Sequence, residues 1–378
     1  MVSRRCGEGK DGIAMTPSAG QDNGAERTWT GASPRPRRWI LPAIYSCLVA
    51  VIVLRLCSGQ TFRWPEGDLL GALRRALPWW FGDSDTALTS IDIRLFRVVL
   101  ALLVGVALAT SGVALQALLR NPLAEPFILG LSTGATVGVV ALQWLGQGAM
   151  AGAVPQHAAA LAGAVLAMLV VYGASQRGGA VDPLGLLLVG VVLSTIGGSI
   201  VMVMHYLMAD GATPVLSRWI MGYLNEGVSS ATVWTVAATT GGGFLLMLLL
   251  ARQMDIGTFS DDEANSMGVD LARLRLIEFV VASALAGGAV VLSGPVAFVG
   301  FVSPHLARLF VGPLHRGLLL AAAPIGAMLI LLSDTASVLT DATTHVGRMP
   351  IGIFTSVAGG VIFVWMLRRQ GPGGPAVH

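Results

Sequence analysis

The side chains that could carry chemistry are few, and they stand near the ends of apolar segments. Lys10 is the only lysine and no GxxxxGK[ST] phosphate-binding loop occurs, so the chain does not hydrolyse ATP by P-loop chemistry. An ion-coupled carrier normally holds a carboxylate or a histidine inside the membrane. The candidates here are expected at segment ends: Asp334 and His205 near outer ends, and Glu278 near an inner end. Without a nucleotide site or a buried ion site, transport by this chain would need energy from a partner ATPase.

The sequence gives no reason to expect a metal ion or another cofactor. His305 stands between Pro304 and Leu306, and no second His, Cys or carboxylate lies at ligand spacing on the same helix, so we expect a structural or gating role for it. The cysteines form no CxxC pair and are interpreted as apolar fillers: Cys6, Cys47 and Cys57. No nucleophile–base pair lies within an apolar segment, which disfavours a membrane enzyme.

The composition indicates an integral membrane protein. Apolar residues make up 54% of the chain, charged residues only 12%, and the mean hydropathy is +0.72. A soluble domain carries about 25% charged residues, because water must wet its surface. The basic residues stand mostly at the ends of apolar runs and form no basic face on a soluble element, which excludes a nucleic-acid-binding protein.

Apolar runs of close to the roughly 20 residues that cross a hydrocarbon core recur along the chain. They predict an all-α, polytopic membrane protein of about ten transmembrane helices, at 39–57, 97–117, 127–146, 156–175, 184–208, 231–251, 276–293, 296–311, 317–333 and 350–367. We expect a disordered cytoplasmic tail at 1–38, a transmembrane domain at 39–368 and a cytoplasmic tail at 369–378. A short amphipathic helix is expected at Glu66–Leu77. The excess of arginine on one side places both termini in the cytoplasm.

Two polar segments interrupt this pattern. In Asn121-Pro122-Leu123-Ala124-Glu125-Pro126, two prolines four residues apart cannot both continue one helix, because each lacks a backbone donor. Such a segment is either a plain cytoplasmic turn or a broken helix that shapes a translocation path. The loop at 252–275 is expected inside the cell, with a short helix that ends at Gly268.

Four motifs carry a resemblance to a known family, in order and with sensible spacing over about residues 90–368. They are Arg94-Leu95-Phe96-Arg97 with the segment Arg120–Ala135; Asp262-Glu263-Ala264-Asn265-Ser266-Met267-Gly268-Val269; Ser293-Gly294-Pro295 through Ser303-Pro304-His305-Leu306-Ala307-Arg308; and Met349-Pro350-Ile351-Gly352 with Gly359-Gly360. The chain resembles the FecCD family of ABC-importer permeases, which includes cobalamin and iron–siderophore permeases. The resemblance implies a permease in the cell inner membrane, paired with a second permease subunit, two ATP-binding-cassette ATPases and an extracytoplasmic substrate-binding protein.

The resemblance also implies roles for single residues. Arg94 and Arg97 match arginines that dock the binding protein, although they could instead anchor a helix end. A third docking arginine is missing, since Val338 stands in its place, and we expect Arg348 to supply the lost charge. The ATPase-coupling residues are then Asp262, Glu263, Ala264, Ser266, Met267 and Gly268. The translocation path or its gate would include Gln116, Asn121, Pro122, Pro126, Gly130, Gly134, Gly294, Pro295, Gly300, Pro304 and His305.

The cargo is the least determined part of this interpretation. We expect an iron–siderophore complex because it is the commonest cargo of the family, with cobalamin or haem as the alternatives. An ion-coupled secondary carrier and a membrane scaffold remain as other classes. A scaffold would not need broken, glycine-rich spans.

Overall fold

The computed structural model describes residues 39–58, 90–145, 156–177, 180–207, 220–345 and 347–369. By its internal contacts the chain divides into Met1–Arg35 and Pro36–His378, and all described residues belong to the second unit. The expected tail at 1–38 and the amphipathic helix expected at Glu66–Leu77 lie outside the described residues.

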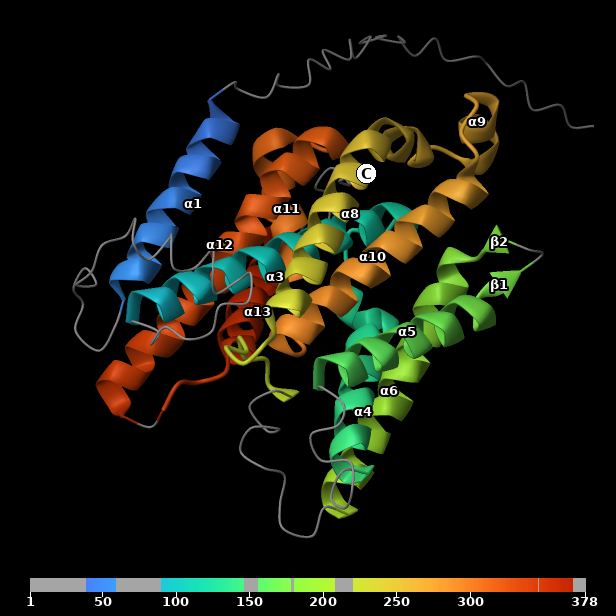
Figure 1. Ribbon diagram of the computed structural model, residues 1–378. Coiled ribbons are helices and arrows are strands. Elements are labelled where there is room, and N and C mark those ends of the chain that lie inside the picture. The colour runs from blue at the N-terminus through green and yellow to red at the C-terminus, as the bar shows by residue number, and fades with distance from the viewer. Residues whose placement is uncertain are drawn as a thin grey trace, which may run out of the picture. The chain divides into compact units, whose positions relative to one another are not determined.

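Each of the apolar runs forms a helix at its predicted place, although the second helix begins at Ser90 instead of residue 97 and the ninth ends at Thr344 instead of residue 333 (Figure 1). In chain order these helices are α1 (Ile40–Cys57), α3 (Ser90–Leu118), α4 (Leu131–Leu145), α5 (Gln156–Ala174), α6 (Pro183–Leu207), α8 (Ser230–Gly257), α10 (Leu271–Ser293), α11 (Val299–Val311), α12 (His315–Thr344) and α13 (Ile351–Arg369). Two short helices lie between them, the 3₁₀ turn η1 (Pro126–Leu129) and α9 (Asp261–Ser266). One antiparallel pair of two-residue strands, β1 (Gln176–Arg177) and β2 (Ala180–Val181), joins α5 to α6. The described residues therefore form an all-helical protein apart from this small hairpin.

Not all of these helices are long enough to cross a membrane. Among the described residues, α1, α3, α6, α8, α10 and α12 have the length and apolar composition of a span, whereas α4, α5, α11 and α13 have shorter apolar stretches. The 13 residues of α11 reach only about 20 Å at 1.5 Å per residue, less than the roughly 30 Å of a hydrocarbon core. The span expected at 296–311 starts later because Gly294 (φ +65°) and Phe298 (φ +70°) turn the backbone out of helical geometry.

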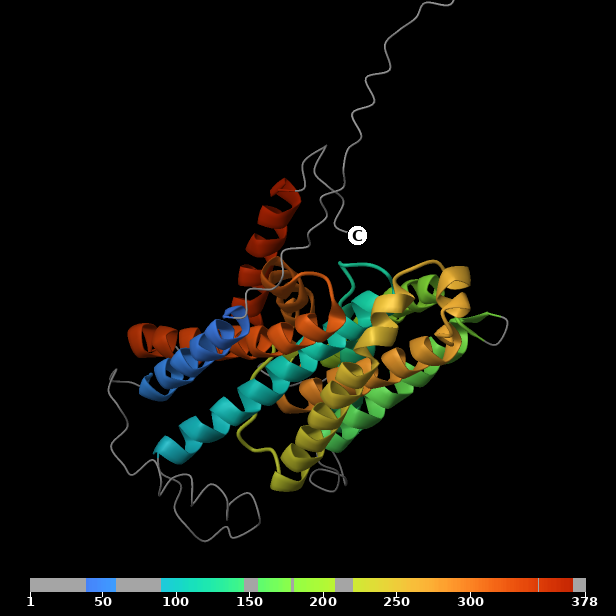
Figure 2. The same ribbon diagram turned by 90° about the horizontal axis from the view of Figure 1, so that it is seen from above.

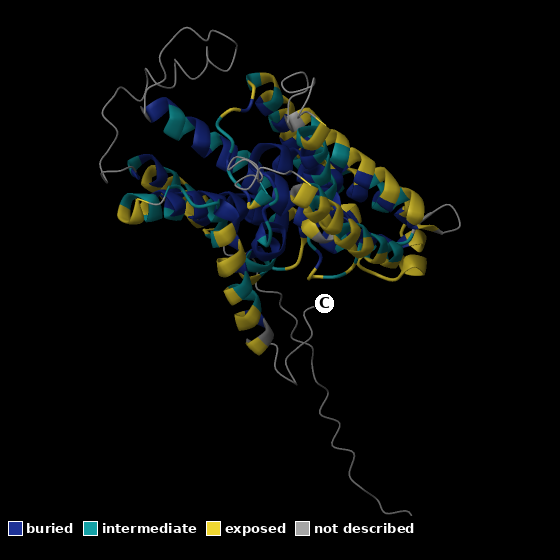
Figure 3. Ribbon diagram, turned by 90° about the horizontal axis from the view of Figure 1, so that it is seen from below, coloured by how far each residue is buried: buried dark blue, intermediate teal, exposed yellow. Residues whose placement is uncertain are grey.

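The helices divide into an inner and an outer group. The most apolar stretch is 78% buried in α3 and α10 and 72% buried in α12, but only 17% in α1 and α6 and 22% in α8. Helix α12 packs against both α3 and α1. Figure 2 shows α1, α3 and α12 on the same side of the bundle, and Figure 3 shows the exposed residues gathered on the outer helices and on α13. Gly105 lets α3 approach α12 closely, since a Cβ there would lie 2.5 Å from the carbonyl oxygen of Gly326. The inner group is thus a tightly packed scaffold.

Candidate functional site

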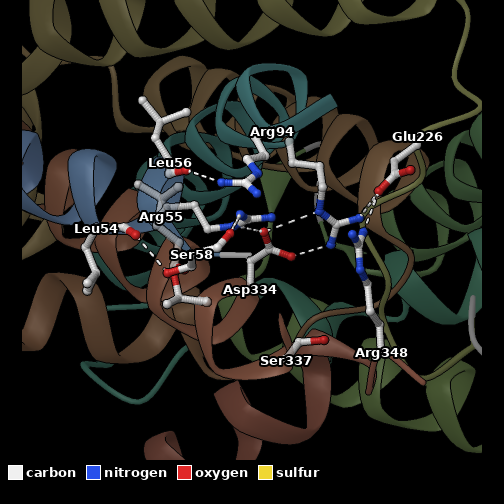
Figure 4. Close-up of polar contacts among 12 residues, drawn as sticks. Leu54, Arg55, Leu56, Ser58, Arg94, Glu226, Asp334, Ser337 and Arg348 are labelled. Carbon is white, nitrogen blue, oxygen red and sulfur yellow. Dashed lines mark hydrogen bonds and ion pairs between the residues drawn. The ribbon is translucent and has the colours of Figure 1, made fainter. Parts of the chain in front are cut away.

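A buried carboxylate ties two inner helices and one outer helix together near one end of the bundle. Asp334 of α12 is fully buried and accepts hydrogen bonds from Arg55 at the end of α1 and from Arg97 of α3 (Figure 4). Both arginine side chains are 1% exposed. A buried charge is costly unless it is paired and hydrogen-bonded, so this arrangement fixes α1 against α3 and α12.

A second carboxylate extends this group of ion pairs to the surface. Glu226 forms ion pairs with Arg97 and with Arg348, whose Nη1 lies 2.9 Å from Glu226 Oε1, and Glu226 and Arg348 are each 35% exposed. The guanidinium carbon of Arg97 stands 5.4 Å from the centre of the Tyr223 ring. We call Arg55, Arg94, Arg97, Glu226, Asp334 and Arg348 the arginine cluster.

The arginine cluster brings together the residues expected to dock a binding protein, but in unequal positions. Arg97 is buried and engaged by carboxylates of its own chain, whereas Arg94 is partly buried and donates from Nη1 to the Leu56 carbonyl at 2.8 Å. Val338 is 7% exposed and carries no charge, and Arg348 enters the cluster through Glu226. Arg348 therefore lies where it can add positive charge beside Arg97.

Two carboxylates that were expected at segment ends lie inside the fold. Asp334 is 0% exposed and Glu278 is 3% exposed. The expectation was wrong for Asp334 because α12 does not stop at residue 333 but continues to Thr344. The side chain of His205, the third candidate, lies outside what the structure describes.

The polar segment between α3 and α4 is broken, as its two prolines predict. It leaves α3 through Arg120, whose φ of +46° is unusual for a residue with a side chain, and the Asn121 side chain accepts the Leu123 N–H at 2.9 Å. Pro126 opens η1, and Gly130 ends it in the left-handed conformation (φ +77°) before α4 begins. We call residues 120–130 the break.

The break is fastened to α11 by two polar links. Gln116 of α3 donates to the Ala124 carbonyl at 3.5 Å and accepts from Nη1 of Arg308 in α11 at 2.6 Å. Glu125 accepts the backbone N–H of Phe298, the residue that precedes α11. Burial raises the pKa of Glu125 to about 7, against the opposing effect of that hydrogen bond.

Close packing adds a third contact between the break and α11. A Cβ on Gly300 would lie 2.6 Å from Cδ of Pro126, so only glycine allows the two segments to touch. Thus Pro126 and Gly300, two residues expected on the path, touch each other, and Gln116, a third, joins the break to the other end of α11.

The other expected path residues are distributed more widely. Gly134 packs α4 against Gly163 of α5, and the Pro295 carbonyl lies beside Gly222. Gly294 closes α10, and Pro304 is buried inside α11. Nδ1 of His305 is buried and has no hydrogen-bond partner in the structure. Among the described residues, no group of three His, Cys, Asp or Glu side chains could hold a metal ion.

The short helix predicted before Gly268 is α9, and its two ends are well capped. Ser260 and Glu263 form a capping box, with the Ser260 N–H at 3.1 Å from Glu263 Oε2, and the hydrogen bonds from Ser260 lower the pKa of the Glu263 carboxyl. At the other end the N–H of Val269 bonds the Ala264 carbonyl at 3.1 Å, while Gly268 has a φ of +83°. This is the Schellman arrangement. It buries Ala264 and leaves Met267 49% exposed at the tip.

An acidic residue joins α9 to two arginines of other elements. Oδ1 of Asp261 lies 2.7 Å from Nη2 of Arg120 and 2.8 Å from Nη2 of Arg275. Burial raises the pKa of Asp261, but the hydrogen bonds and charges of Arg275 and Arg120 outweigh this effect and hold the pKa below its ordinary value. The Arg120–Asp261 pair could not be predicted from the sequence, because its members stand far apart in the chain.

Comparison with known proteins gives a consistent result over most of the chain. The model of the FecCD transport family matches residues 47–369. The hemin transport system permease protein HmuU of Yersinia pestis is 36% identical over 85% of this chain and 94% of its own length. The cobalamin import system permease protein BtuC of Halobacterium salinarum is 35% identical over 78% of each chain. The Fe(3+) dicitrate transport system permease protein FecC of Escherichia coli is 34% identical over 74% of this chain and 83% of its own.

A solved structure supports the same fold. It is an inward-facing conformation of an ABC transporter assigned to the metal-chelate type, 25% identical to this chain. The two superpose with a TM-score of 0.69 over 87% of this chain and 98% of the other.

Proposed function

The chain belongs to the FecCD transport family of ABC-transporter membrane permeases, and on that basis we propose that it imports an iron–siderophore complex. The observation that carries the cargo proposal is the similarity to a relative whose name states a non-haem iron chelate, Fe(3+) dicitrate. The chain is a permease and not an enzyme, and the energy for import comes in this proposal from separate ATPase subunits. Haem and cobalamin are the competing cargoes, since the hemin and cobalamin permeases are similarly close.

An ion-coupled carrier is a weaker alternative. Of the two buried carboxylates that could serve such a carrier, Asp334 is hydrogen-bonded by Arg55 and Arg97, so its charge is already balanced within the chain. Glu278 of α10 is therefore the residue on which that alternative rests.

We propose the following assembly for the transporter. Two permease chains associate with two ATP-binding-cassette ATPases and an extracytoplasmic binding protein, in the cell inner membrane and with both termini cytoplasmic. Arg94, Arg97 and Arg348 guide docking of the binding protein, the first and last by direct contact and Arg97 by holding Glu226 in place. Charge pairs of this kind steer encounter and fix register more than they add affinity.

We propose that α9 docks on the ATPase and that the break and α11 shape the translocation path. The exposed tip of α9 supports the first role, because Met267 offers apolar surface on a helix whose ends are rigidly capped. The polar links of the break to α11 support the second, because they join two irregular segments of backbone. Alternating access follows when nucleotide binding moves α9.

The assembly is tested by purifying the tagged chain in mild detergent and measuring co-purifying ATP hydrolysis. Gly268→Trp places a bulky side chain directly after α9, where a Cβ meets nothing within 4 Å among the described residues. Gly312→Trp is the matched control, because Gly312 has the same φ of +83° and the same open surroundings but lies beyond α11. We expect wild type and the control to retain the ATPase and Gly268→Trp to lose it. Transport without any associated ATPase would contradict the assembly.

The cargo is tested by uptake into proteoliposomes that contain the full transporter and its binding protein. Radioactive iron bound to a hydroxamate or catecholate siderophore, hemin and cobalamin are offered separately with ATP inside or outside the vesicles. We expect ATP-dependent uptake of an iron–siderophore complex. Uptake of hemin alone or cobalamin alone would replace the siderophore proposal with that cargo.

A further inference from the structure

Arg120 stands at the junction between the break and the helix expected to meet the ATPase. Arg120 is the first residue of the break. Its guanidinium points to α9, with Nη2 at 2.7 Å from Oδ1 of Asp261. The same guanidinium donates from Nε to the Gly257 carbonyl at 3.0 Å, at the end of α8. One side chain thus connects the break, α8 and the first residue of α9.

The backbone of Arg120 shows that its conformation is held by its surroundings. Its φ is +46°, in the left-handed region that residues with a side chain rarely adopt. The backbone N–H of Arg120 bonds the Ala117 carbonyl at 3.1 Å. Contacts of the guanidinium to Asp261 and Gly257 therefore add to the forces that keep the chain in this strained turn.

We propose that the Arg120–Asp261 pair is the positioning link through which movement of α9 reaches the break. This proposal rests on the proposed function, in which α9 docks on the ATPase. Asp261 is the first residue of α9, so a displacement of that helix moves the carboxylate directly. Arg120 is covalently bonded to Asn121, so its displacement moves the break.

The break can then pass the displacement on to α11. Glu125 holds the Phe298 N–H at the start of α11, and Pro126 packs against Gly300 in its first turn. Gln116 joins the Ala124 carbonyl to Arg308 near the other end of α11. The structure therefore offers a continuous series of contacts from α9 through the break to α11.

The exposure of the pair indicates a role in position and not in stability. The Arg120 and Asp261 side chains are 35% and 50% exposed. Ion pairs at such a surface contribute little to folding. Variants of either residue should therefore fold and assemble, which allows their effect on coupling to be measured separately.

The test follows the exposure of the break in the complete transporter, with its ATPase, in proteoliposomes. Leu123, which is 47% exposed, is replaced by cysteine in a chain whose native cysteines are serine. The rate of reaction with a maleimide is compared without nucleotide and with ATP plus vanadate. This readout needs no knowledge of the cargo, and ATP hydrolysis is measured on the same samples.

We expect the wild-type labelling rate to change with nucleotide and that change to be lost in Arg120→Gln, with ATP hydrolysis retained, and also in Asp261→Asn. Arg120→Lys, which keeps the charge, should restore part of the change. Arg275→Gln is the matched control. Arg275 of α10 is the second arginine that pairs with Asp261, and its replacement should keep the nucleotide response.

Two results would overturn the link. The first is a wild-type nucleotide response in both Arg120→Gln and Asp261→Asn; the second is an equal loss in Arg275→Gln, which would assign the effect to the charge around α9 in general. Failure of wild-type chain to bring any ATP hydrolysis into the vesicles is a different result, because it overturns the proposed function along with the link.

Discussion

Replacement of Asp334 by asparagine should destabilise the protein more than any other single charge removal in the arginine cluster. The change keeps the shape of the side chain but removes the charge that balances Arg55 and Arg97. Both guanidinium groups are 1% exposed, so water cannot take over from the lost carboxylate. Breaking a buried ion pair by removal of one partner costs about 3–5 kcal/mol, which is roughly a 10²- to 10⁴-fold change in the folding equilibrium.

The geometry of the cluster also predicts the order of effects. Arg55→Met should cost less than Asp334→Asn, because Asp334 keeps Arg97, whose Nε and Nη2 both reach the carboxylate. Ser333→Ala is the control on the neighbouring residue, since among the described residues the Ser333 hydroxyl bonds only the Leu329 carbonyl one turn back, at 2.8 Å. Loss of that bond should cost about 1 kcal/mol or less.

Thermal unfolding of the purified chain in mild detergent measures these differences. For Asp334→Asn the midpoint should fall on the order of 10 °C, by the scaling of soluble proteins, with a smaller fall for Arg55→Met and almost none for Ser333→Ala. An unfolding midpoint of Asp334→Asn equal to that of Ser333→Ala would refute the reasoning, because it would mean that the two arginines find other partners or water.

Three further changes test other parts of the structure. Burial raises the pKa of Glu125 to about 7, so the folded chain holds this proton more tightly than the unfolded chain, and the stabilisation that this gives at low pH is lost as pH rises from about 4.5 to 7. The temperature of the unfolding midpoint should therefore fall less between pH 5 and pH 8 in Glu125→Gln than in wild type. The same pH dependence in both proteins would contradict a raised pKa of Glu125. Gly105→Val should separate α3 from α12, because a Cβ there lies 2.5 Å from the Gly326 carbonyl oxygen; overpacking of this kind costs about 1–3 kcal/mol or more, measured as reduced stability in detergent. Ser260→Ala removes the cap that bonds Glu263 and should cost α9 about 1 kcal/mol, seen as faster amide hydrogen exchange in α9 with an unchanged unfolding midpoint.

The helices could be predicted well because span length and hydropathy are local properties of the chain. The clearest departure is α12, which runs to Thr344 although its apolar segment was expected to end at residue 333. The added turns are polar, but their hydroxyls bond carbonyls four residues back, as Thr335 bonds Leu331 and Thr340 bonds Ala336, both at 2.8 Å. A polar composition can therefore continue as helix, and hydropathy alone does not reveal it.

The candidate site could be predicted only where its residues form a contiguous motif. The two prolines of the break and the glycine after α9 each predict the backbone conformation at their own position. The ion pairs do not, since Arg55 and Asp334 are 279 residues apart and Arg97 and Glu226 are 129 residues apart. An arginine at the end of the first apolar run was visible in the sequence, but nothing local identified its partner.

The distribution of strain separates a rigid part of the protein from a part that is suited to move. The inner helices meet through glycine, as Gly105 meets α12, and such contacts admit no alternative register without a steric clash. The break and the start of α11 instead carry two of the three described non-glycine residues with positive φ, Arg120 and Phe298. Each of these two residues makes a polar bond that can break and re-form, Arg120 with Asp261 and Phe298 with Glu125. A strained backbone conformation that depends on one polar bond can relax when that bond breaks. We therefore expect a displacement of α9 to change the conformation of the break and of α11 before it disturbs the inner helices.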